Sequence, residues 1–206
     1  MILKKIDRGL SAESGAEKLQ CRSSGWGSVF RRLFYRVWMN MEQLFLVLPA
    51  PEHRTEYDAM MAEWSATGDR IHPGPLRKFA NDYQAFLANV DNYYDVSSST
   101  YFMTDSSGRI LGAINIRNCL NERLLVNGGH IGYGVRPSER RKGYAKAMLS
   151  MALGKCRESK INRVLLTCEK TNLASVWTIL ACGGMLENEV VDEHGTTYLR
   201  YWVALS

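Results

Sequence analysis

The chain has 206 residues, of which 46% are apolar and 23% charged, a composition typical of one globular domain with or without an appendage. This composition excludes a collagen, a disordered acidic chain and a coiled coil. No apolar run approaches the roughly 18 residues that a membrane-spanning helix needs, so we expect no membrane span.

The positive charge of the chain is confined to its N-terminal part. Residues 1–40 contain eight basic and three acidic residues, whereas the rest of the chain contains 18 of each sign. Because a nucleic-acid-binding domain usually carries its basic excess on the folded surface, we expect no nucleic-acid partner. We therefore predict a basic N-terminal extension over residues 1–40 and a folded domain over residues 41–206.

Within the extension, residues 29–38 mix apolar side chains with three arginines, a pattern typical of a short basic amphipathic helix. Four roles are open for this segment: it could contact a membrane surface, contact a partner, pack on the domain or form a flexible extension. Met39 and Met41 directly precede the first strand-like run, which offers a start position downstream of the extension.

Cysteine and histidine usage argues against disulfides and metal. The five cysteines form no C-x-x-C pair, and the four histidines show no spacing typical of a zinc site. We expect reduced thiols, a cytoplasmic location and no metal site.

The pattern of apolar residues, punctuated by Pro, Gly and polar clusters, predicts the secondary structure. Predicted strands cover residues 44–48, 100–104, 110–116, 129–135, 163–168, 185–191 and 197–204, and predicted helices cover 51–68, 76–90, 140–158 and 171–182. This order predicts an α+β fold: a mixed, mostly antiparallel sheet of about seven strands flanked by helices.

The stretch from Gly129 to Ser150 carries the most chemistry. A strand ends at Pro137, a basic turn carries Gly143, and an amphipathic helix starts. Such a helix N-terminus gathers unpaired N–H groups and favours a pyrophosphate, although a solvated charged cap is the alternative. The Walker pattern is absent because Gly154-Lys155 is followed by cysteine, and the dinucleotide pattern G-x-G-x-x-G is absent too.

At this turn the sequence Arg140-Arg-Lys-Gly143-Tyr-Ala145 resembles the R/Q-x-x-G-x-G/A signature of the GCN5-related N-acetyltransferases, the GNAT family. Asn172-Leu-Ala-Ser175 and Gly183-Gly184 resemble the later coenzyme A segment of that family. The run Gly-Gly-Met-Leu-Glu-Asn is similar to a bacterial branch of predicted acetyltransferases. The resemblance implies the acyl-CoA N-acyltransferase fold, with acetyl-CoA as cosubstrate.

The resemblance also implies where the coenzyme binds. In the family, a central strand splays from its neighbour, and its open backbone pairs with the amides of pantetheine. Gly132 and Gly134 suit such a strand, with tight packing as the alternative. Helix capping is the alternative role for Asn172. The implied coenzyme-binding residues are Tyr133, Gly134 and Val135 on the strand, Arg140, Arg141, Lys142, Gly143, Tyr144, Ala145 and Lys146 at the turn, and Asn172 and Ser175 in the later segment.

The implied reaction is direct transfer of an acetyl group from acetyl-CoA to a primary amine of a small molecule or protein. The N–H of Val135 would stabilise the oxyanion. His130, Glu169 and a water chain are the alternatives for the general base. The usual proton-donating tyrosine of the family is replaced by Ile179, so a non-catalytic acyl-CoA-binding or interaction module is the alternative function.

The acceptor side is expected to be formed by the first two helices and residues 117–127. Arg117, Asn121 and Trp64 are candidate contacts for the amine, with a structural role as the alternative for each, and analogy with the family suggests a homodimer.

Overall fold

The computed structural model describes residues 43–91 and 95–205. The predicted extension over residues 1–40 and its helix at 29–38 lie outside these residues, so both stay predictions, as does the domain boundary.

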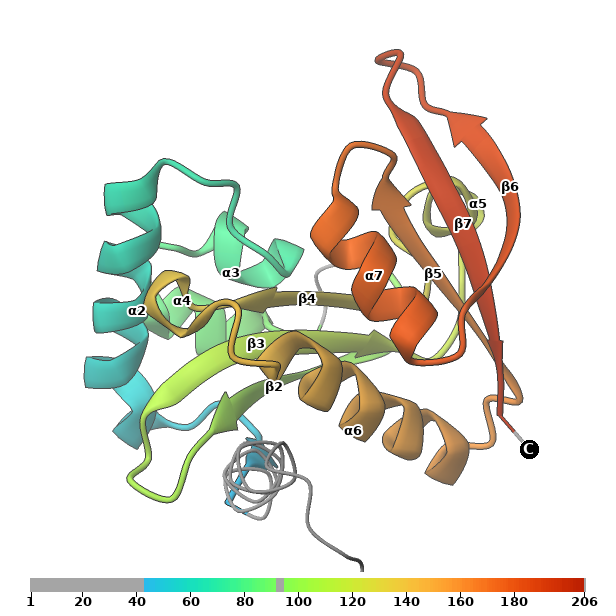
Figure 1. Cartoon of the computed structure of the whole chain (residues 1–206). Helices are drawn as coiled ribbons and strands as arrows, with labels where there is room; N and C mark the ends of the chain where they lie inside the picture. The colour runs from blue at the N-terminus through green and yellow to red at the C-terminus, as the bar shows by residue number, and fades with distance from the viewer. Residues whose placement is uncertain (1–42, 92–94, 206) are drawn as a thin grey trace, which may run out of the picture. The chain divides into compact units, whose positions relative to one another are not determined.

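Seven strands in the described part form two sheets, and every pairing is antiparallel (Figure 1). The strands are β1 Phe45–Val47, β2 Ser98–Thr104, β3 Ile110–Arg117, β4 Ile131–Val135, β5 Arg163–Glu169, β6 Met185–Val191 and β7 Thr197–Ala204. The first sheet has the order β1-β2-β3-β4 and the second the order β5-β7-β6. The predicted fold class is confirmed, with the strands divided between two sheets.

Helices cover both faces of the four-stranded sheet, α6 on one face and α2, α3 and α4 on the other. The helical elements of the described part are η1 Pro51–His53, α2 Arg54–Thr67, α3 Gly74–Lys78, α4 Tyr83–Asn89, α5 Glu122–Val126, η2 Pro137–Glu139, α6 Tyr144–Glu158 and α7 Leu173–Ala181. Neighbouring strand residues point to opposite faces. On β2, Met103 belongs to the core beneath α6, whereas Phe102 belongs to the core formed with α2, α3 and α4.

The predicted apolar stripe of the first helix forms the second of these cores. Tyr57 packs on Phe86 with ring centroids 5.2 Å apart, and Phe86 packs on Phe102 at 5.8 Å. Trp64 is 2% exposed in the same core. Full burial of such side chains contributes about 1.5–3 kcal/mol each, so the burial of Trp64 fits the structural role that was its alternative.

Two helix predictions need correction because capping side chains start new helices. The helix expected at 76–90 is two short helices, since the Asp82 carboxylate accepts a hydrogen bond from Ala85 N at 2.9 Å and begins α4. The loop expected at 117–127 contains α5, which begins where the Asn121 side chain accepts from Leu124 N at 2.9 Å. Asn121 is therefore a capping residue.

None of the helices in the described part is both long and apolar enough to cross a bilayer. Within residues 43–91 and 95–205, no group of three or more His, Cys, Asp or Glu side chains could hold a metal ion.

Candidate functional site

Strand β4 presents an open backbone edge toward β5. Arg117 N donates to His130 O at 2.8 Å, and Arg136 N donates to Leu111 O at 2.9 Å, at the two ends of the β3–β4 ladder. Because bonding alternates along an antiparallel ladder, the even-numbered residues of β4 bond to β3. The N–H and C=O groups of Tyr133 and Val135 therefore point away from β3, where an extended ligand can pair with them.

The two sheets touch at the beginning of this edge. His130 N donates to Leu165 O at 2.8 Å, and Leu165 N donates to His130 Nδ1 at 2.9 Å. Although they touch here, β4 and β5 belong to different sheets, as the splay implied by the family resemblance requires.

The hydrogen bonding of His130 favours a structural role over that of a general base. His130 is 7% exposed, and its Nδ1 lone pair accepts a hydrogen bond from Leu165 N–H. The neutral ring then carries its proton on Nε2 and has no lone pair left for an amine proton. Burial and the charge of Arg117 lower the pKa of His130, which keeps the ring neutral.

On β4, Gly134 faces the α2–α3 loop, residues 68–73, and Gly132 faces the Arg117 side chain. A Cβ at Gly134 would collide with the carbonyl oxygen of His72, and one at Gly132 would lie 2.8 Å from Arg117 Nη2. Both glycines are therefore tightly packed on this face, which was the alternative to a role in coenzyme binding. Arg117 itself is buried and donates to Gly128 O at 2.7 Å and to Gly129 O, so its observed contacts hold the chain that enters β4.

After β4 the chain makes the turn that precedes α6. Arg141 and Gly143 have positive φ angles of +61° and +89°, and Gly143 is the N-cap residue of α6. No side chain caps this helix, and a Cβ at Gly143 would have no atom within 4 Å. The first N–H groups of α6 and the positive end of its dipole thus face open space, which suits a pyrophosphate.

Two of the basic residues at the turn already form ion pairs. The Arg140 guanidinium binds the Asp69 carboxylate, lowers the pKa of that carboxyl and lies 3.4 Å from Val135 O. Lys142 Nζ donates to Glu139 Oε2 at 2.8 Å. The turn would therefore hold an anion mainly through its backbone.

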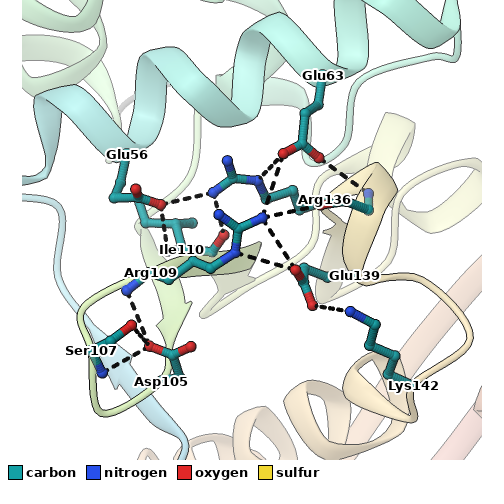
Figure 2. A network of polar contacts seen from close by, with 10 residues as sticks. Glu56, Glu63, Asp105, Ser107, Arg109, Ile110, Arg136, Glu139 and Lys142 are labelled. Atoms are coloured by element: carbon teal, nitrogen blue, oxygen red, sulfur yellow. Dashed lines mark hydrogen bonds and ion pairs between the residues drawn. The ribbon is translucent and has the colours of Figure 1, made fainter.

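A network of charged side chains connects the residues before this turn to α2 (Figure 2). The buried Arg136 guanidinium lies between two carboxylates of α2, 2.7 Å from Glu63 Oε1 and 2.8 Å from Glu56 Oε2. Glu63 also accepts from Ser138 N at 3.1 Å, and Arg109 donates to Glu139 at 3.2 Å. Burial opposes the ionisation of Glu63, but the hydrogen bonds from Ser138 and Arg136 outweigh it and lower its pKa.

The later coenzyme segment lies at the start of α7. Asn172 Oδ1 accepts from Ser175 N at 3.1 Å, so Asn172 caps α7, as its alternative role expected. Ile179 is 1% exposed and packs against Gly184, which leaves no proton donor at that position. Burial raises the pKa of Tyr133 to about 12, and its hydroxyl is enclosed beneath α7.

The α2–α3 loop contributes residues to the site that the sequence did not predict. Asp69 binds Arg140, and the adjacent Arg70 lies 3.2 Å from Glu169 at the end of β5. His72 lies over Gly134. No motif marks this loop, because its partners are about 70 to 100 residues away in the sequence.

Comparisons with known proteins show the family and the fold of this chain. Residues 56–183 match the model of the acetyltransferase (GNAT) family. The microcin C7 self-immunity acetyltransferase MccE, solved with acetyl-CoA and AMP, is 18% identical, with a TM-score of 0.60 over 79% of this chain and 93% of that one. A dodecameric spermidine N-acetyltransferase from Vibrio cholerae is 14% identical, with a TM-score of 0.57 over 79% and 94%.

Among curated protein sequences, none matches the chain significantly. At these identities the two solved structures establish a shared fold, and the family model covers more than half of the chain. The chain therefore belongs to the GNAT family of acetyltransferases.

Proposed function

We propose that the protein transfers the acetyl group of acetyl-CoA directly to a primary amine of a small molecule or protein. The observation that carries the proposal is the open edge of β4, which η2 and the turn at residues 140–143 connect to the uncapped N-terminus of α6. When bound, acetyl-CoA supplies an acetyl group activated as a thioester.

The residues present fit this cosubstrate. The outward N–H groups of Tyr133 and Val135 and the C=O of Tyr133 match the amides of a pantetheine arm, whereas Val135 O already accepts from Arg140 Nε at 3.4 Å. The space beside Gly143 admits a pyrophosphate, which the backbone N–H groups from Arg140 to Lys146 would bind. Asn172 and Ser175, at the start of α7, would face the arm from the other side.

The backbone N–H of Val135 is our candidate for the donor to the thioester oxygen as negative charge develops there. The acceptor must be a neutral amine, because an ammonium group has no lone pair for attack. Glu169, at the end of β5, and a water chain stay as candidate proton acceptors, and the Glu169 carboxylate is oriented by Arg70.

Direct attack is favoured over transfer through a cysteine. Burial raises the pKa of Cys182, although Lys146 opposes this shift, and burial raises the pKa of Cys168 to about 11. Both groups therefore remain thiols, which are weak nucleophiles compared with thiolates. Homodimer formation stays a prediction.

The proposal is tested by measuring the release of CoA thiol from acetyl-CoA with a broad panel of primary amines. We expect release that depends on both enzyme and amine, together with an acetylated product detected by mass spectrometry. Release at the uncatalysed rate with every amine would contradict the proposal and favour a coenzyme-binding module.

A further inference from the structure

The chain that enters β4 is joined to β5 by a reciprocal pair of hydrogen bonds. His130 N donates to Leu165 O at 2.8 Å, and Leu165 N donates back to Nδ1 of the His130 ring at 2.9 Å. In a regular sheet both of these bonds would end on backbone carbonyls. At this join the imidazole of His130 therefore takes the place of a backbone acceptor.

The backbone carbonyls on this side of the join are engaged by β3. His130 O accepts from Arg117 N at 2.8 Å, and Arg117 Nη1 donates to Gly128 O at 2.7 Å and to Gly129 O at 2.9 Å. Gly129 also lies directly on β5, because a Cβ built on it would be 2.4 Å from Leu165 O. The three carbonyls thus serve β3, and a side chain supplies the acceptor for Leu165 N–H.

The join lies at one end of the edge that the proposed coenzyme would occupy, so this inference rests on the proposed function. β4 and β5 lie in different sheets, which leaves the outward N–H groups of Tyr133 and Val135 for a ligand. The turn that would bind the pyrophosphate follows the other end of β4. A pantetheine arm that starts at this turn runs along β4 toward the join, with its acetylated end on the side of His130.

The imidazole controls the spacing of the two strands at the join. A buried N–H without an acceptor is costly, because it loses the hydrogen bond that it makes to water in the unfolded chain. Without His130 Nδ1, β5 would shift until another group pairs with Leu165 N–H, and the space beside β4 would change. His130 is 7% exposed, and its ring packs edge-on against Trp202 of β7 with centroids 6.4 Å apart, which holds the acceptor in place.

We propose that His130 is a positioning residue for acetyl transfer: its imidazole fixes β5 at the start of the β4 edge and thereby sets the place of the thioester. In this role Nδ1 is a fixed hydrogen-bond acceptor, and the ring transfers no proton. The role requires a neutral ring, which burial and the charge of Arg117 favour by lowering the pKa of His130.

Two substitutions of His130 separate this role from that of a general base. His130→Leu removes the acceptor, whereas His130→Asn keeps an accepting oxygen, Oδ1, at the position of Nδ1 and cannot act as a base. His53→Leu is the matched control, because His53 Nδ1 also accepts from a backbone N–H, that of Ala50 at 3.0 Å, at the start of α2. Both leucine variants thus lose one hydrogen bond of the same kind.

The affinity for acetyl-CoA is measured by calorimetry, and kcat and KM by thiol release with the amine that the wild type acetylates fastest. We expect His130→Leu to bind acetyl-CoA at least about tenfold more weakly and its kcat to fall by up to about 100-fold, because a displacement of about 1 Å can cost this much. His130→Asn should restore most of both values and keep the pH profile of kcat/KM. His53→Leu should match the wild type in both.

Normal acetyl-CoA binding and turnover in His130→Leu, or equal losses in His53→Leu, would overturn the inference. An inactive His130→Asn that binds acetyl-CoA normally would also overturn it, because His130 would then be a general base; this outcome can be read even if His130→Leu does not fold. If acetyl-CoA binding depends on His130 as predicted but the wild type acetylates no amine, the inference is supported and the proposed function is contradicted.

Discussion

Gly143 is the residue on which the proposed coenzyme binding at the turn depends most directly. Its φ of +89° and the open space beside it place backbone N–H groups where a pyrophosphate can approach. Gly143→Glu puts bulk and negative charge there, so we expect the affinity for acetyl-CoA in calorimetry to fall by about 100-fold or more, given that charged hydrogen bonds each contribute roughly 1.5–3 kcal/mol.

Gly195→Glu is the control variant, because it introduces the same kind of backbone strain as Gly143→Glu at a position away from the turn. Gly195 has a φ of +79°, lies in the turn between β6 and β7, and also has no atom within 4 Å of a built Cβ. Both variants share the cost of a left-handed side chain, about 1–2 kcal/mol. We expect Gly195→Glu to bind acetyl-CoA normally, and an equal loss in both variants would show that strain, rather than the turn, controls binding.

At the scale of elements, Arg136 joins α2, β3 and η2 through Glu56, Glu63 and the Ile110 carbonyl (Figure 2). Arg136→Met leaves two carboxylates facing each other. Removing one partner of a buried pair costs about 3–5 kcal/mol, and we expect about 2–3 here because the glutamates are 35% and 27% exposed. Urea unfolding measures this loss, and weaker acetyl-CoA binding should accompany it.

The exposed pair of Arg54 and Asp58 provides the comparison for this element-scale effect. Arg54→Met should change the free energy of unfolding by less than about 1 kcal/mol, because surface ion pairs contribute little. If Arg136→Met is as stable as Arg54→Met, the network does not hold the turn.

The sequence predicted elements well where the pattern is local. β6 and β7 match their predicted ranges because alternation and a Gly195 turn define both ends. The sequence did not predict α5, because five residues are too few to show a helical period. It predicted α3 and α4 as one helix, because the apolar pattern continues across the Asp82 cap that separates them.

At the scale of the whole described domain, the site combines segments that are far apart in the sequence. The family signature predicted the turn and the edge of β4, since both depend on consecutive residues. It could not predict that Leu165 N–H occupies His130 Nδ1, or that the α2–α3 loop reaches Arg140 and Glu169. Those contacts arise from tertiary packing, which leaves no periodic trace in the sequence.

The central claim is that acetyl-CoA binds along β4 with its pyrophosphate at the start of α6. The most direct test is a calorimetric titration of the protein with acetyl-CoA and, in parallel, with acetyl-pantetheine, which lacks the pyrophosphate and nucleotide. The account predicts saturable binding of acetyl-CoA and much weaker binding of acetyl-pantetheine. Absence of acetyl-CoA binding, or equal affinity for the two compounds, would contradict it.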